Sequence, residues 1–154
     1  MIRSMKRAKD VKEVIKNSGC VRLKSLRKVA KGFEIEDEEL FRIGPFVCHK
    51  QSAKLYKFVY RGVDASGLLL SIVCKLLRGY KSKIGTVKTV RVVREMEVKL
   101  RNEYSAHNFE VMIAHIFLRT VLGDAVLYED EKKRRFVVDV AKALEKIREF
   151  GAEC

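Results

Sequence analysis

The chain has 154 residues, the length of one ordinary domain, and 47% of them are hydrophobic, which excludes a disordered chain. Lys and Arg number 33 against 20 Asp and Glu, so the formal net charge is +13. Such an excess of positive charge on a small protein indicates a polyanionic partner, most commonly nucleic acid. The scarcity of Gln and Asn is typical of a thermophilic surface rich in Lys–Glu pairs, but such pairing does not explain the unbalanced charge.

The sequence predicts a soluble, cytoplasmic protein. Its longest apolar run, around residues 67–74, is much shorter than the roughly 20 residues that cross a bilayer, and the charged N-terminus lacks a signal-peptide core. We expect no membrane partner. The cysteines are widely spaced and form no C-x-x-C pair, so we expect reduced thiols, with Cys20, Cys48 and Cys74 as small buried hydrophobes. A zinc site that gathers them with His49 is the less favoured alternative, and we expect no metal or cofactor.

The first fifty residues predict helices separated by polar turns. Hydrophobic periodicity predicts a helix over residues 4–18 and a short basic helix over residues 21–31 that ends at Gly32. An acidic turn over residues 34–39 follows, and Pro45 marks a break.

The middle of the chain is more apolar. A third helix is expected over residues 52–62, and residues 64–79 predict a buried central helix. Residues 80–89 predict a basic loop. Residues 84–94 combine the valine alternation of a strand with helical spacing; we interpret a helix from Thr89, and the choice between helix and strand stays open.

Two amphipathic helices are expected in the last third, one over residues 109–122 and one that is capped by Asp130 and ends at Gly151. Helix after helix with short connections predicts an all-α fold, a compact single-domain bundle of about six to seven helices. Residues 1–50 are its less regular part, and residues 51–154 form the helical core.

Positive charge is segregated along the chain. Residues 14–33 carry six Lys and Arg, residues 65–94 carry seven, and neither stretch contains an acid. This segregation is typical of a protein that follows a phosphate backbone with one face. Tyr80, in the basic loop, is a candidate for stacking on a base. The residues expected to bind RNA are Arg22, Lys24, Arg27, Lys28, Lys31, Lys75, Arg78, Lys81, Lys83, Lys88, Arg91 and Arg94.

Known catalytic motifs such as the P-loop, the dinucleotide-binding fingerprint and the zinc-protease helix do not occur, so we expect no enzyme and no small-molecule substrate. One alternative is a ribonuclease. The pair Arg101 and His107 resembles the R-x(4–6)-H signature of HEPN-type ribonucleases, in which arginine stabilises the charged phosphorane and histidine moves a proton. Another alternative is a DNA-binding helix-turn-helix protein that uses residues 21–32 as its recognition helix.

The helical pattern resembles a known family. A basic first helix, the Ser66–Gly67–Leu68 start of an apolar helix, residues 108–123, and the closing residues 143–152 resemble the small all-helical subunit of type III-B (Cmr-type) CRISPR effector complexes. Ser66 stands where that family usually has asparagine, and residues 20–50 have no counterpart. The resemblance implies a non-catalytic subunit of a ribonucleoprotein complex for antiviral defence, whose partners are the guide RNA, the target RNA and other subunits.

Overall fold

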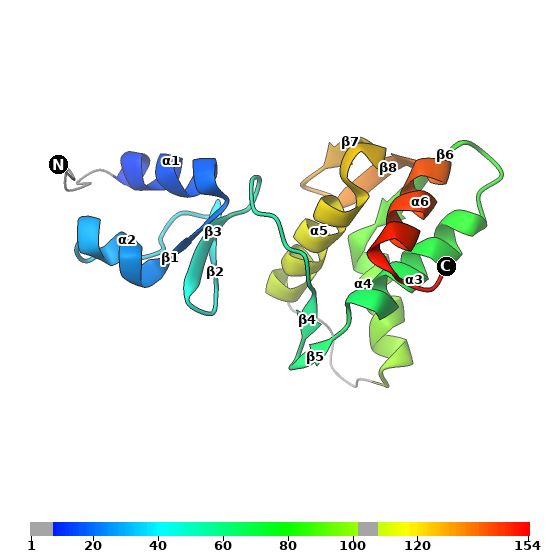
Figure 1. Ribbon diagram of the computed structural model, residues 1–154, viewed down its shortest axis with the longest axis horizontal. Helices are drawn as coiled ribbons and strands as arrows, with labels where there is room; N and C mark the ends of the chain where they lie inside the picture. Colours follow the sequence, from blue (N-terminus) through cyan, green and yellow to red (C-terminus); the bar gives the residue numbers. More distant parts are fainter. Residues whose placement is uncertain (1–7, 102–107) are drawn as a thin grey trace. The chain divides into compact units, whose positions relative to one another are not determined.

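The computed structural model describes residues 8–101 and 108–154, and it divides the chain into two compact units, Met1–Lys54 and Leu55–Cys154 (Figure 1). We call them unit 1 and unit 2. Each unit has its own apolar core. The boundary lies close to residue 50, where the sequence predicts a change from a less regular part to a helical core.

The fold is mixed α/β, so the predicted all-α bundle is wrong. The described residues contain six α-helices and three antiparallel sheets with eight strands. Each strand is only two to five residues long. Such short strands show too few alternations for a period of two to be distinguished from adjoining helical periodicity.

Unit 1 is a three-stranded sheet with two helices, and its elements in order are α1 (Ala8–Ser18), β1 (Cys20–Arg22), α2 (Leu23–Val29), β2 (Leu40–Ile43) and β3 (Phe46–His49). Strand β3 is central, between β1 and β2. Strands β2 and β3 form a hairpin whose turn includes Gly44 with a φ of 52°, a conformation that suits glycine. Val11 and Ile15 of α1 pack with Leu23 and Leu26 of α2 in the core.

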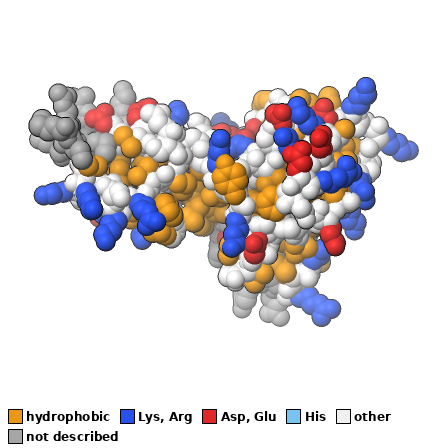
Figure 2. All heavy atoms as spheres, viewed as in Figure 1, with side chains coloured by type: hydrophobic (Ala, Val, Ile, Leu, Met, Phe, Trp, Pro, Cys, Tyr) orange, Lys and Arg blue, Asp and Glu red, His pale blue; other side chains and the backbone are white. Residues whose placement is uncertain are grey.

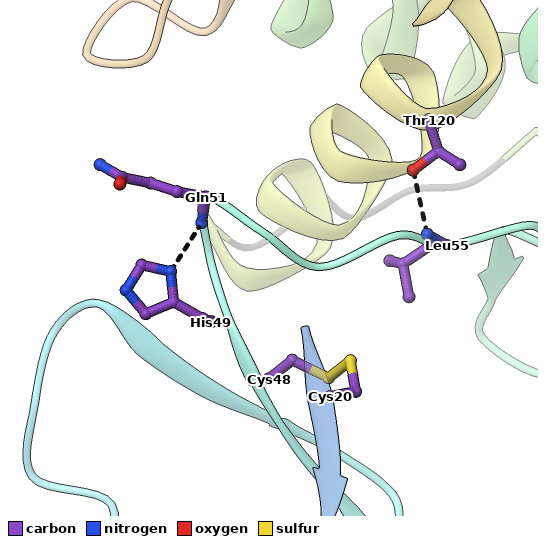
Figure 3. The surroundings of a disulfide bond; sticks show 6 residues. All are labelled: Cys20, Cys48, His49, Gln51, Leu55 and Thr120. Atoms are coloured by element: carbon purple, nitrogen blue, oxygen red, sulfur yellow. Dashed lines mark hydrogen bonds between the residues drawn. A yellow bond between two sulfur atoms is a disulfide. The ribbon is translucent and has the colours of Figure 1, made fainter. Parts of the chain in front are cut away.

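A disulfide joins the strands of unit 1. Cys20 of β1 and Cys48 of β3 lie directly opposite each other in the antiparallel register, and their side chains form one bridge (Figure 3). Cys74 of unit 2 is bridged to Cys154. The prediction of reduced thiols is therefore wrong, because the fold brings together cysteines that are 28 and 80 residues apart in sequence.

Unit 2 holds the remaining elements, which are β4 (Val59–Tyr60), β5 (Val63–Asp64), α3 (Ser66–Arg78), β6 (Ile84–Lys88), α4 (Thr89–Lys99), α5 (Asn108–Leu122), the 3-10 turn η1 (Gly123–Ala125), β7 (Val126–Asp130), β8 (Arg135–Asp139) and α6 (Val140–Phe150). The sheet order is β6-β8-β7, and α3 packs against α4, α6 and β6. Leu69, Leu70, Leu77, Phe117 and Phe136 are fully buried in this core.

The helices expected over residues 64–79, from Thr89, and over residues 109–122 are confirmed as α3, α4 and α5. The helix expected over residues 52–62 is wrong. Arg61 and Gly62, with φ values of 48° and 83°, instead form the two-residue turn of the β4–β5 hairpin, in which both positions need positive φ.

The predicted basic loop and the predicted last helix are each partly strand. The chain turns into β6 at Ile84, which resolves the open choice for residues 84–94 as strand and then helix. Strand β8 precedes α6, whose N-cap is Asp139 rather than Asp130; its carboxylate accepts a hydrogen bond from the Lys142 amide at 3.1 Å. Gly151 ends α6 in the left-handed conformation, as expected. None of the helices described is both long and apolar enough to cross a membrane.

Candidate nucleic-acid interface

The acid-free stretch of residues 65–94 folds into one continuous part of unit 2. It comprises α3, the following loop, β6 and the first half of α4. The apolar side chains of α3 are buried against the core, so its polar residues Lys75 and Arg78 are left at the surface. Figure 2 shows Lys and Arg side chains projecting from the end of unit 2 at which β6 and the preceding loop lie.

All twelve basic residues predicted to bind RNA are exposed. Within residues 8–101 and 108–154, Arg91 is the only one of the twelve that forms an ion pair with an acid; its Nε lies 3.8 Å from Glu95 Oε1. Arg22 lies over the Phe46 ring at 5.3 Å, and Arg27 donates a hydrogen bond to the Phe33 carbonyl. The charges that the sequence singles out are therefore mostly available to a partner.

Other basic side chains behave differently. Lys12, Arg61 and Arg119 pair with acids at distances of 2.7 to 3.3 Å, and both Lys142 and Lys146 pair with Asp124. These contacts lower the pKa of the Asp124 carboxyl, chiefly through the hydrogen bond from Lys142. Apart from the pair of Arg91 and Glu95, the ion pairs expected of a thermophilic surface thus use residues outside the two segregated clusters.

Tyr80 is held in place at the start of the loop. Its hydroxyl donates a hydrogen bond to the Thr86 carbonyl at 3.2 Å. A Cβ at position 85 would lie 3.1 Å from the Tyr80 ring and 3.0 Å from Val140, so glycine lets the ring lie close to β6. The side chain remains 42% exposed. Tyr80 is therefore a positioned aromatic surface rather than a freely moving loop residue.

A pocket of about 320 Å³ adjoins this tyrosine. Lys88 and Arg91 supply its positive charge, and Leu76, Gly79, Tyr80 and Thr86 complete the lining. Helix α4 begins at Thr89, so the positive end of its dipole lies next to Lys88. We call the exposed Lys and Arg residues of positions 75–94, with this pocket, the basic surface of unit 2.

A buried polar chain fixes the start of α4. The Thr89 hydroxyl lies 2.8 Å from His115 Nδ1, His115 Nε2 lies 3.2 Å from Glu129, and Arg119 contacts the same carboxylate. Burial raises the pKa of Glu129, but the His115 hydrogen bond and the Arg119 charge outweigh burial, and the pKa lies below its ordinary value. Thr89 is fully buried and cannot reach a substrate, so this chain positions α4 and is no catalytic triad.

The sequence identifies only part of this chain. His115 is buried on α5, among apolar residues. Its partners Thr89 and Glu129 are 26 and 14 residues away in sequence, and no local pattern links them.

The first basic cluster lies in unit 1, next to acids. Lys24, Arg27 and Lys28 are exposed on α2, while Glu34 to Glu39 form an irregular segment between α2 and β2. Lys12 holds this segment through Asp37 at 3.2 Å and Glu39 at 2.7 Å. The fully buried His49 also contacts Glu39 through Nε2, and the backbone N–H of Gln51 donates a hydrogen bond to His49 Nδ1 (Figure 3).

The sequence also offered two alternative sites, the ribonuclease pair Arg101 and His107 and a recognition helix over residues 21–32. Arg101 is exposed just after α4, with a φ of 53°, but His107 lies outside the described residues, so the proposed ribonuclease pair stays a prediction. Residues 21–32 do not form the second helix of a helix-turn-helix. Strand β1 separates α1 from α2, and α2 is only seven residues long.

In the described part of the chain, no three His, Cys, Asp or Glu side chains converge in a way that would hold a metal ion. Comparison with protein-family models, with curated proteins and with solved structures finds no match.

Proposed function

We propose that the protein binds nucleic acid, RNA in the first instance, through backbone phosphates at the basic surface of unit 2, and that it does not cleave it. The observation that carries this proposal is the state of seven basic side chains: all are exposed, and within the described residues only Arg91 is paired with an acid. Unpaired surface charges of one sign interact strongly with a polyanion, because binding releases its condensed counterions.

The position of the cluster supports the same function. Lys88 and Arg91 border a pocket that Tyr80 also lines, so charge and an aromatic face occur together. A groove that combines cations with aromatic side chains is the usual architecture for binding a nucleic-acid strand without sequence preference. A solvated surface alone does not require a tyrosine to be held by both a hydrogen bond and a glycine contact.

The expected role as a subunit of a CRISPR effector complex rested on the resemblance alone. The resemblance to a CRISPR effector subunit implies an all-helical body, and the eight strands remove that basis. What remains of that expectation is RNA binding without catalysis, which the basic surface supports independently.

The test is fluorescence anisotropy with a labelled single-stranded RNA, in a salt series without added metal, followed by gel analysis of the RNA. We expect the logarithm of the binding constant to fall linearly with the logarithm of the salt concentration, and we expect the RNA to stay intact. Cleaved RNA that is spared by His107→Ala would contradict the proposal and favour the ribonuclease. Absence of binding at low salt would remove the basic surface as an interface.

One observation favours a second candidate, duplex DNA binding by a helix-turn-helix in unit 2. Helix α3, strand β6, helices α4 and α5, and the β7–β8 hairpin follow one another, with β6 paired to β8; this is the order of helix-turn-helix domains that carry a β-hairpin wing. However, eight residues of α5 are buried, and its first turn carries Glu110 rather than a cation. Preference for one duplex sequence over single strands would favour this candidate.

A further inference from the structure

Arg91 borders two separate pockets on unit 2. The first, of about 320 Å³, contains Tyr80, Thr86 and Lys88. The second, of about 340 Å³, is lined by Arg91, Arg94, Glu95, Val98 and Lys99, all on α4. Because Arg91 belongs to both linings, the two hollows adjoin each other on one surface.

The first pocket offers an aromatic wall. The Tyr80 ring is fixed by its hydrogen bond to the Thr86 carbonyl and by its close approach to Gly85. Leu76 adds an apolar side chain, and Lys88 adds a cation. Most of the lining is polar, so a flat ligand with polar edges and a negative charge next to it matches this pocket.

The second pocket is apolar and surrounded by charge. Val98 is 77% exposed, although nothing in its position on a surface helix requires an apolar residue there. Residues 91, 94, 95 and 98 follow the spacing that places side chains on one face of a helix. Val98 therefore shares this face with Arg94 and Glu95, and Arg91 and Lys99 complete the lining of a shallow, open hollow.

We propose that this site is specific for single-stranded nucleic acid: Arg91 binds a backbone phosphate, and the two pockets receive the bases on either side of it, with Tyr80 stacking on one of them. The inference rests on the proposed function and specifies its ligand. Arginine suits the central position because its planar fork binds phosphate oxygens in pairs. In a duplex the bases are already paired and stacked, so only single strands can place them in pockets.

The first experiment compares three ligands by fluorescence anisotropy: a short single-stranded RNA, the same strand in a duplex, and the same backbone with abasic residues. The abasic strand keeps every phosphate, so it isolates the contribution of the bases. We expect it to bind about tenfold more weakly than the intact strand. Equal binding of the two overturns this inference and leaves phosphate binding standing, whereas binding of none of the three overturns the proposed function. A duplex that binds more tightly than the single strand also overturns the inference.

The second experiment uses matched variants. Tyr80→Leu removes the aromatic face, and Tyr80→Phe keeps it while losing the hydroxyl. We expect Tyr80→Leu to weaken the intact strand about fivefold or more but to leave the abasic strand unchanged, and Tyr80→Phe to restore most of the affinity. If Tyr80→Leu weakens both strands equally, the ring only supports the surrounding structure and the inference fails. Circular dichroism of each variant confirms that unit 2 stays folded.

Discussion

Units 1 and 2 share an order of elements but differ in what their charges do. In each unit a helix, a short strand and a second helix come before a hairpin whose last strand pairs with that first strand; in unit 2 the β4–β5 hairpin precedes this order and α6 follows it. In unit 1 the segment between the second helix and the hairpin is acidic and irregular, whereas in unit 2 a helix, α5, occupies that position. The basic cluster of each unit lies in a stretch without acids, residues 14–33 in unit 1 and 65–94 in unit 2, but only in unit 1 do five acids follow within six residues, at positions 34–39.

The comparison teaches that net charge alone does not locate an interface. Both units carry a basic cluster, and both clusters are exposed. In unit 1, five acids lie within residues 34–39 of the same small domain and reduce the attraction of a phosphate chain at moderate salt. We therefore expect unit 2 to dominate binding.

The largest expected effect concerns the disulfides, one in each unit. The bridge from Cys74 to Cys154 spans 80 residues and that from Cys20 to Cys48 spans 28. The chain-entropy model gives about 4.5 kcal/mol for the longer loop and about 3.6 kcal/mol for the shorter one. We expect Cys74→Ala to lower the free energy of unfolding of unit 2, and Cys20→Ala to lower that of unit 1. Calorimetry should show the larger loss for Cys74→Ala.

All five tyrosines belong to unit 2, so tyrosine fluorescence during denaturation reports on that unit alone. The matched control is reduction with dithiothreitol. It should move the denaturation midpoint of the wild type, followed by tyrosine fluorescence, toward that of Cys74→Ala, and it should leave the midpoint of Cys74→Ala unchanged. A Cys74→Ala protein as stable as the wild type would show that the bridge does not stabilise unit 2.

The next effect compares two matched sets of charge removals. Lys88→Gln, Arg91→Gln and Arg94→Gln together remove three positive charges from unit 2, and Lys24→Gln, Arg27→Gln and Lys28→Gln remove three from α2 of unit 1. We expect the first set to weaken single-stranded RNA binding about 100-fold at low salt and to reduce the salt slope by about 3. The second set should weaken it only severalfold. Equal losses from the two sets would contradict the assignment of binding to unit 2.

A smaller effect distinguishes unit 1 by its response to acid. The hydrogen bond from Lys12 lowers the pKa of Glu39, and the Glu39 amide lowers that of Asp37, below their ordinary values of 4.5 and 3.8. A carboxyl whose folded pKa is lowered stabilises the fold above its ordinary pKa and loses that contribution as the pH falls through the folded value. We expect the hydrogen-exchange protection factors in residues 30–40, that is, the exchange rates corrected for the intrinsic pH dependence of amide exchange, to fall below about pH 4. The double variant Asp37→Asn, Glu39→Gln should show low protection factors in these residues already at neutral pH, and the factors should depend much less on pH. A wild type whose protection factors do not fall in acid would refute the stabilising role of Asp37 and Glu39.

The smallest effect sharpens the picture of unit 2. Glu95 is the acid that pairs with Arg91, and it lines the second pocket. Glu95→Gln should release Arg91 and remove a repulsive charge, so RNA should bind a few times more tightly. Glu149→Gln makes the same charge change on the exposed end of α6 and should have less effect. Weaker binding by Glu95→Gln would show that the pair itself contacts the ligand.

The sequence predicts the long elements of this protein well. The apolar runs of α3 and α5 and the glycine at position 151 each carry a strong local signal, and each is confirmed. The strands are missed because their partners are distant in sequence: Ile84 pairs with Asp139, and Cys20 pairs with Cys48. Residues 135–139 read as helix since Phe136 and Val140 hold helical spacing with the residues that follow.

The candidate site is predictable to a similar extent. The seven basic residues and Tyr80 follow from charge segregation along the chain, because an exposed Lys or Arg needs no tertiary information to be recognised. The pocket beside Tyr80 does not follow, since it depends on how β6 packs against α3 and α4. The buried chain from Thr89 to Glu129 also depends on contacts between distant residues.

The most direct test of the account is a nuclear magnetic resonance titration of the isotopically labelled protein with single-stranded RNA. Amide signals report on each unit separately, so one experiment compares both basic clusters. We predict that the largest shifts fall in the end of α3, in residues 79–88 and on α4, and that α2 of unit 1 changes little. Shifts concentrated on Lys24 to Lys28, or on the turn between β7 and β8, would contradict the claim that the basic surface of unit 2 is the interface.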